Sequence, residues 1–103
     1  MNFIYFVIIL MKKRGYTYIM ASKKRGVLYV GVTSNLYHRV RQHKNEVNEG
    51  FTKRYHIHFL VRYQKFDLII DAIAYEKQLK GRLRSKKIAL IEEDNPYWND
   101  LML

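Results

Sequence analysis

Two short runs rich in β-branched and aromatic residues most constrain the fold of this chain. They are YTYIMA at 16–21 and VLYVGV at 27–32, and the polar segment SKKRG lies between them. Two such runs joined by about five polar residues that include glycine predict a β-hairpin. Gly31 lies inside the second run, where it marks a bulge or the close approach of another group. We therefore expect a fold that begins with a hairpin.

The segment after the hairpin predicts an amphipathic helix. It opens with the N-cap side chains of residues 33–35. Its buried stripe has helical spacing and comprises Leu36, Val40, His43 and Val47. We expect this helix to end near Gly50. Arg39 and His43 are four residues apart, so both side chains project from one side of the helix toward a shared ligand.

The rest of the chain predicts one more strand and two helices. An irregular basic connection at 51–58 leads to a strand at 59–66, with Leu60, Arg62 and Gln64 on one face and Phe59, Val61 and Tyr63 on the other. Asp67 or Asp71 then caps a helix that Gly81 ends, and a last helix at 82–93 stops at Asn95-Pro96. The order β-β-α-β-α-α predicts an α/β fold in which helices flank a small, mostly antiparallel three-stranded sheet.

The first fourteen residues differ in composition from the rest. Residues 1–10 are apolar and MKKRG follows them. About ten residues is half of a membrane span, and a secretory signal carries its positive charge before the apolar run. We expect residues 1–14 to be an extension or arm outside a domain at 15–100, with Met11 as the working start, a cytoplasmic location and no stable membrane insertion. An added edge strand and a peripheral membrane contact are the alternatives.

The charge distribution predicts a polyanionic partner. The 103 residues include 19 Lys and Arg against 9 Asp and Glu, which gives a formal net charge of +10. The basic residues gather in particular segments, while acids gather near the C-terminus. We predict DNA as the partner, with RNA also open, and leave the oligomeric state open. The predicted nucleic-acid contacts are Lys23, Lys24, Arg25, Lys53, Arg54, Lys77, Lys80, Arg82 and Arg84.

Disulfides, thiolate chemistry and cysteine-based zinc sites are excluded, because the chain has no cysteine. The four histidines have no recognisable metal-ligand spacing. His56 and His58 alternate, so they would share one face of a strand, whereas His38 and His43 are five apart and do not stack on a helix. We therefore expect no dedicated histidine metal site.

A phosphodiesterase set is present among the remaining polar residues. Cleavage of a phosphodiester requires an activated water and neutralisation of charge on the phosphoryl oxygens. One carboxylate, Glu76, suffices to hold Mg²⁺ or Mn²⁺, because such ions keep several waters. The Arg39 guanidinium suits phosphate oxygens, and Tyr18 or Tyr29 accepts a proton when a nearby cation lowers its pKa. Each of these residues also has a structural reading, since tyrosines pack in strands and Glu76 pairs with Lys80 at i,i+4.

In order and spacing, these residues resemble those of a small stand-alone GIY-YIG nuclease domain. The two name motifs correspond to residues 16–18 and 29–31, and a Ser/Thr-Asn-Leu segment, an arginine and a later glutamate follow them. The resemblance covers about residues 15–100. It implies that Tyr29 is the general base or its partner, that Tyr18 orients it or the water, that Arg39 stabilises phosphoryl charge, that Glu76 binds the metal, and that His43 assists near the scissile phosphate.

The chain departs from the family pattern at two positions. Tyr16 replaces the glycine of the first motif, and Val32 stands where many relatives have a phosphate-attracting lysine. Asn95 is a counterpart for the late asparagine of the family. The resemblance implies a metal-dependent DNA endonuclease that is structure-selective and serves DNA repair or processing. The alternative is a nucleic-acid-binding domain of this family with little or no catalytic activity.

Overall fold

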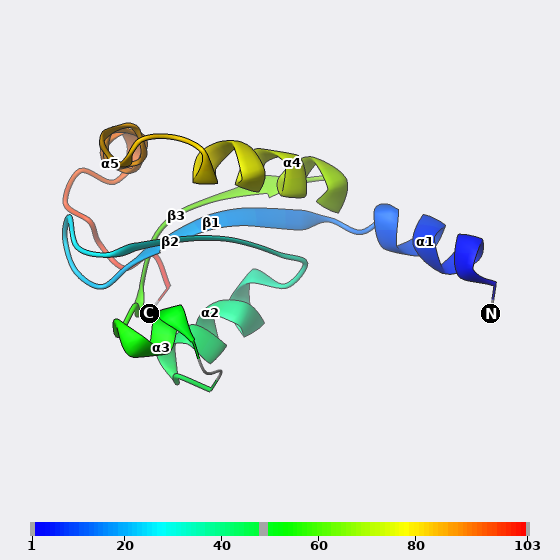
Figure 1. The fold of residues 1–103 in the computed structure, drawn as a ribbon, viewed down its shortest axis with the longest axis horizontal. Helices are drawn as coiled ribbons and strands as arrows, with labels where there is room; N and C mark the ends of the chain where they lie inside the picture. Colours follow the sequence, from blue (N-terminus) through cyan, green and yellow to red (C-terminus); the bar gives the residue numbers. More distant parts are fainter. Residues whose placement is uncertain (1, 48–49, 103) are drawn as a thin grey trace.

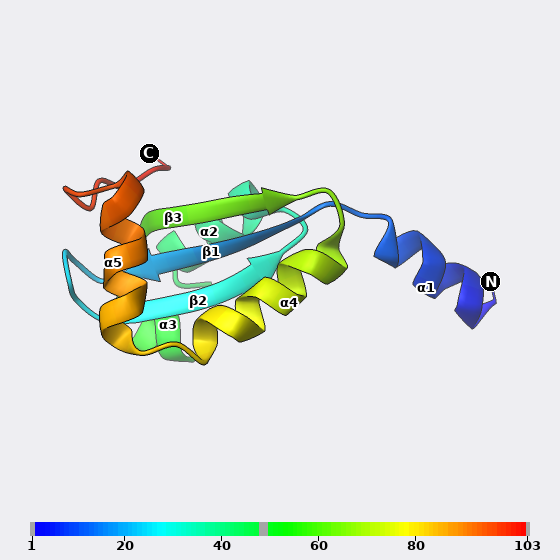
Figure 2. The ribbon, with the colours of Figure 1, turned by 90° about the horizontal axis from the view of Figure 1, so that it is seen from above.

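A three-stranded antiparallel sheet in the order β2-β1-β3 lies at the centre of the fold (Figures 1 and 2). The computed structural model describes residues 2–47 and 50–102. Along the chain the elements are α1 (Phe3–Met11), β1 (Gly15–Ala21), β2 (Leu28–Thr33), α2 (Leu36–Lys44), α3 (Phe51–Arg54), β3 (Phe59–Phe66), α4 (Ile69–Lys80) and α5 (Arg84–Asp94). The predicted α/β class and antiparallel sheet are confirmed.

The predicted hairpin forms from β1 and β2. Tyr18 pairs with Gly31 and Met20 pairs with Tyr29, so the two tyrosines are diagonal neighbours on one face of the sheet. The polar connection folds into a turn in which the Ser22 N–H donates to the Val27 carbonyl at 3.0 Å. The register of the hairpin therefore brings both tyrosines to the same face.

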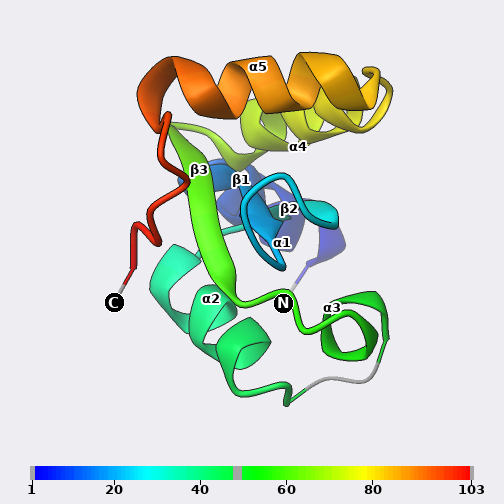
Figure 3. The ribbon, with the colours of Figure 1, turned by 90° about the vertical axis from the view of Figure 1, so that its left-hand side faces the viewer.

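The helices divide between the two faces of the sheet (Figures 1 and 3). On one face α4 and α5 cover a core that includes Ile19, Val30 and Ile91. On the other face α2 and the segment containing α3 cover a core that includes Tyr18 and Val40. Because β1 is central and nearly all buried, it reads as a continuous apolar run and not as an alternating one.

The predicted alternation of β3 side chains between the two faces of the sheet is wrong in the first half of the strand. A bulge between Ile19 and Met20 shifts the pairing, so that Ile19 lies opposite Arg62 while Met20 lies opposite Leu60. Leu60 therefore packs on the α2 side, whereas Arg62 reaches the α5 side and donates to the Leu90 carbonyl at 3.1 Å. One extra residue places these two side chains on opposite faces.

Three features of the helices differ from the predictions. The segment at 51–58 was expected to be irregular, but it contains the short helix α3. The helix α2 ends at Lys44 and not near Gly50, so Val47 is exposed and lies outside the buried stripe. The N-cap of α4 is Leu68, which makes no side-chain cap hydrogen bond, so neither Asp67 nor Asp71 is the cap. Asn35 caps α2 as expected, with Oδ1 accepting from the His38 N–H at 3.1 Å.

The N-terminal residues form the helix α1 and not an edge strand. It leads away from the sheet at the end opposite to α5 (Figure 2). Several of its apolar side chains are exposed, with Phe3 78% and Ile4 67% accessible. Within residues 2–47 and 50–102, no helix is both long enough and apolar enough to span a bilayer.

Candidate active site

The sheet face beneath α2 carries Tyr18 and Tyr29, and Tyr18 lies in direct contact with a glycine. The Tyr18 ring lies over Gly31, where a Cβ atom would stand 2.9 Å from Cε1 and still closer to Cζ and the hydroxyl. Only glycine therefore leaves space for the phenol in this position. Of the bulge and the close approach that the sequence suggested for Gly31, the structure has the close approach.

His43 links the two tyrosines to the helical layer. Its Nε2 lies 3.0 Å from the Tyr18 hydroxyl, and its Nδ1 lies 3.1 Å from the Thr52 hydroxyl. The imidazole centroid is 5.8 Å from the Tyr18 ring and 5.2 Å from the Tyr29 ring. Asn35 sets the start of α2, so it fixes the helical phase that points His43 at the sheet.

Burial sets the protonation states of this pair. Burial, then the neighbouring Tyr29, raises the pKa of Tyr18 to about 12, although Arg39 opposes the rise. Burial, then the charge of Arg39, lowers the pKa of His43 to about 4. At neutral pH a protonated phenol therefore meets a neutral imidazole. The neutral ring has one donor and one acceptor nitrogen, which matches its two hydroxyl partners.

Arg39 supplies the positive charge at this face. It is partly buried on α2, one turn before His43. Its Nη1 donates to Gln42 Oε1 at 3.1 Å, and its charge acts on Tyr18 and Tyr29. The remaining guanidinium donors are suited to an anionic group brought to the tyrosines.

The structure does not join Glu76 to this group. Glu76 lies on α4, on the opposite face of the sheet from α2, where α4 runs along the β2 edge (Figure 2). Its side chain is 12% exposed and its Oε1 is 3.2 Å from Lys80 Nζ. Among the described residues, Lys80 is the one polar side chain that Glu76 contacts. The ion pair between Glu76 and Lys80 that the i,i+4 spacing predicts is therefore formed.

Glu76 nevertheless has the donor chemistry that a hard cation requires. Its carboxylate has two oxygens, of which Oε1 faces Lys80, and Mg²⁺ binds through one or two carboxylates while keeping several waters. The Lys80 side chain is 54% exposed and ends a flexible stem, so it is free to move aside. The carboxylate thus fits a Mg²⁺ or Mn²⁺ ion that needs few protein ligands.

The predicted nucleic-acid contacts fall into two groups. Lys53 and Arg54 lie on α3, where Phe51 contacts the Tyr29 ring at a centroid distance of 6.4 Å. The others lie on the β1–β2 turn and near the α4–α5 junction (Figure 3). Several of them already have partners within the chain. Arg25 makes two hydrogen bonds to Glu92, Arg84 donates to the Arg25 and Gly26 carbonyls, and Lys80 forms an ion pair with Glu76.

Other residues have roles that the sequence did not indicate. Thr52 holds His43 from α3, and the contact depends on a tertiary arrangement without a local signal. Asn95 is buried, and its Nδ2 donates to the Val61 carbonyl on β3 at 3.0 Å and to the Asn99 carbonyl at 2.9 Å. It therefore ties the end of α5 to β3, and none of its hydrogen bonds involves the tyrosines.

Comparison with known proteins agrees with the motif order and the fold. The GIY-YIG catalytic domain matches residues 14–89. A UPF0213 protein of Pediococcus pentosaceus is 36% identical over 67 residues, which are 65% of this chain and 70% of that protein. The solution NMR structure of a UPF0213 protein from Bacillus halodurans covers 84% of this chain and 92% of its own, with a TM-score of 0.53 and 24% identity. The chain belongs to the GIY-YIG family.

Proposed function

We propose that this protein is a divalent-metal-dependent endonuclease that hydrolyses DNA phosphodiester bonds. Its catalytic domain would span residues 15–100, with 1–14 as an arm, and it would act in the cytoplasm on DNA selected by structure, in repair or processing. The observation that most supports this proposal is the meeting of Tyr18, Tyr29, Arg39 and His43 on one sheet face. Family membership supports the same activity.

The chain's own residues have distinct parts in this proposal. Tyr18, with its pKa near 12, stays protonated. Its hydroxyl forms a 3.0 Å hydrogen bond with His43 Nε2, and this bond holds the phenol in position. Tyr29 is more exposed than Tyr18, so it meets the attacking water, and in its phenolate form it accepts the proton that the water loses. Arg39 binds the non-bridging phosphoryl oxygens and stabilises the charge that grows on them.

Glu76 would hold the divalent ion at the β2 edge, because α4 runs along this edge and Tyr29 lies on the same strand. When bound, the ion supplies charge neutralisation and a template for the leaving oxygen. Metal binding by Glu76 also requires Lys80 to leave its ion pair. A phosphate backbone favours this movement, because the lysine gains a new anionic partner. The DNA would lie over Lys53 and Arg54 on the tyrosine side.

A nicking assay tests the proposal. Purified protein is incubated with supercoiled, branched and single-stranded DNA, and with RNA, with and without Mg²⁺ or Mn²⁺. Arg39→Gln and Glu76→Gln should each lower the rate by about 100-fold or more, and Tyr29→Phe should do so as well. The matched controls are Arg41→Gln and Glu93→Gln, exposed residues of the same types, and Tyr97→Phe, a tyrosine 77% exposed; all three should nick at rates near that of the parent.

The second candidate is a domain that binds nucleic acid without cutting it. The Glu76–Lys80 ion pair and Val32 favour it, because the first occupies the metal ligand and the second removes a phosphate contact. A parent protein that shifts DNA in a salt-sensitive manner but nicks none of the substrates would support this candidate and refute the endonuclease. Equal nicking by the parent, Arg39→Gln and Glu76→Gln would refute the assigned roles.

A further inference from the structure

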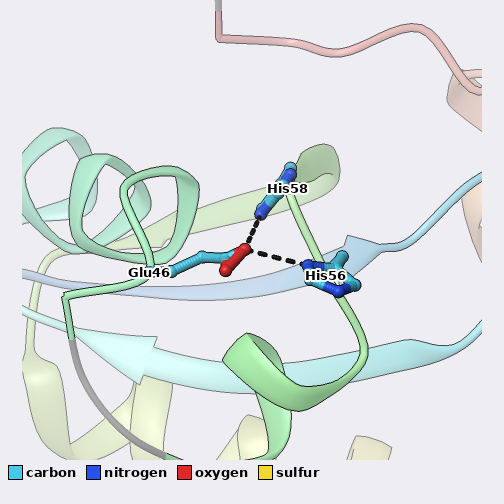
Figure 4. A group of neighbouring side chains, drawn as sticks. All are labelled: Glu46, His56 and His58. Atoms are coloured by element: carbon cyan, nitrogen blue, oxygen red, sulfur yellow. Dashed lines mark hydrogen bonds and ion pairs between the residues drawn. The ribbon is translucent and has the colours of Figure 1, made fainter.

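Three metal-binding side chains meet away from the tyrosine site. One carboxylate oxygen of Glu46 lies 3.0 Å from His56 Nδ1 and 3.0 Å from His58 Nε2 (Figure 4). The three ligand atoms all lie within 4.8 Å of one another. His56 and His58 are not on a strand, contrary to the expectation from their alternation, because β3 begins at Phe59. The fold thus gives two histidines a partner that is distant in sequence.

The backbone brings two of these residues together at a conformational cost. Glu46 follows α2 and His56 follows α3, each at the position after the C-cap, with φ of 52° in both cases. The hydrogen bonds from Val47 N–H to the Gln42 carbonyl and from Ile57 N–H to the Thr52 carbonyl close both helix ends in the same way. Glycine is the usual residue at such a position. Here each position instead carries a side chain with a metal-ligand atom, and both point to the same place.

From this arrangement we propose that Glu46, His56 and His58 bind a divalent transition metal ion, with Zn²⁺ as the preferred species. Two imidazoles and one carboxylate form a known zinc ligand set that leaves one position for water. Ligand atoms in a tetrahedral zinc site lie about 3.3 Å apart, and the two nitrogen–oxygen separations are already 3.0 Å. Small side-chain movements are enough to admit the ion.

The surroundings permit an ion here. His56 is 73% exposed and His58 is 36% exposed, so solvent reaches the site and supplies the remaining ligand. The nearby Lys44 donates to the His58 carbonyl and forms an ion pair with Asp100, which offsets its charge. Imidazole ligands favour zinc, nickel or copper over Mg²⁺, so this site differs in selectivity from Glu76 and does not depend on nuclease activity.

The bound ion would act as a clip between α2 and the segment that carries α3. Glu46 ends the first element, and His56 and His58 lie between the second and β3. The same two elements are joined by the hydrogen bond between His43 and Thr52. Holding them together stabilises the folded state, because the unfolded chain lacks the preformed site.

Calorimetric titration of the untagged, metal-stripped full-length protein with ZnCl₂ tests this inference, with MgCl₂ as the comparison. We expect one Zn²⁺ per chain, no matching heat with Mg²⁺, and a Tm raised by about 5 °C or more near saturation. His56→Asn and His58→Asn should each weaken binding by about 10-fold or more, and Glu46→Gln should do the same. The matched control is His38→Asn, which removes an exposed histidine of α2 outside the cluster.

The outcomes separate clearly. Loss of affinity in the three cluster variants, with parental affinity in His38→Asn, supports the site. The proposal is overturned if Zn²⁺ fails to bind in a saturable manner, if the affinity falls equally in His38→Asn, or if His56→Asn binds as well as the parent. His56 is mostly exposed, so this variant keeps the fold and remains informative if Glu46→Gln does not.

Discussion

The substitution Gly31→Ala tests whether the close approach of Tyr18 to β2 builds the site. A Cβ at this position would lie 2.9 Å from Tyr18 Cε1 and closer still to Cζ and the hydroxyl, whereas ordinary contacts are 3.4–4 Å. The ring therefore has to retreat by about 1 Å, and overpacking of this kind costs about 1–3 kcal/mol of unfolding free energy. Against this, alanine recovers about 0.5–1 kcal/mol of backbone entropy relative to glycine.

We expect Gly31→Ala to lower the free energy of unfolding by a net of about 1–2 kcal/mol, which corresponds to a fall in Tm of about 5–15 °C. Urea denaturation and a thermal melt measure this change. Gly81→Ala is the matched control, because its Cβ would meet only backbone oxygens at 3.6 and 3.7 Å; it should be neutral or slightly stabilising. The same retreat breaks the 3.0 Å contact between Tyr18 and His43, and any nicking activity should fall by about 100-fold.

A double-mutant cycle identifies the cause. Tyr18→Leu removes the atoms that Cβ would strike, so Gly31→Ala should cost little or nothing in the Tyr18→Leu background. If Gly31→Ala is as stable as the parent, or is equally destabilising with and without the Tyr18 ring, then steric exclusion is not the reason for glycine at this position. In that case the close approach of Tyr18 to Gly31 would not be what builds the site.

Three further predictions concern single polar side chains and their hydrogen bonds. Folding lowers the pKa of His43 from 6.5 to about 4. The contribution of neutral His43 to the unfolding free energy is therefore fully present above pH 6.5, and the unfolding free energy falls by about 2–3 kcal/mol toward pH 4. Urea titrations of His43→Gln should show a smaller fall. Asn95→Ala leaves the Val61 carbonyl unpaired and should cost about 2–3 kcal/mol in urea denaturation, whereas a cost no greater than that of Asn99→Ala would contradict this role. Hydrogen bonds from Arg25, then Trp98, lower the pKa of Glu92 to about 2, so its stabilisation is present above pH 4.5 and is lost as the pH falls through 2; acid-unfolding midpoints that match between the parent and Glu92→Gln would refute this linkage.

Local signals were sufficient to predict the hairpin, the sheet class and the neighbouring positions of Tyr18 and Tyr29. The β-rich runs, the polar turn and the Asn35 cap each act within a few residues, and they determine where Tyr18, Tyr29 and Arg39 lie. The proximity of His43 to both tyrosines follows from the same elements, because the cap sets the helical phase.

Features that depend on tertiary contacts were not predicted. The bulge between Ile19 and Met20 has no sequence signal that separates it from a regular strand, so Leu60 and Arg62 were placed on one face. The helix α3 has only four residues, which is too short for periodicity to reveal. No local pattern relates Glu46 to His56 and His58, because α3 lies between them in the sequence.

The two proposed sites share a structural dependence on the segment between β2 and β3. His43 and Glu46 both lie at the C-terminal end of α2, and their partners Thr52 and His56 both lie on or just after α3. The first tie holds the imidazole against Tyr18, and the second fixes where the two helix ends meet. Because His43 has little freedom when both of its nitrogens are hydrogen-bonded, the position of α3 determines the position of the ring over the tyrosines. The short helix α3 has no buried residue of its own, so these polar ties and the contact between Phe51 and the Tyr29 ring place it, and the geometry of the tyrosine site depends on them.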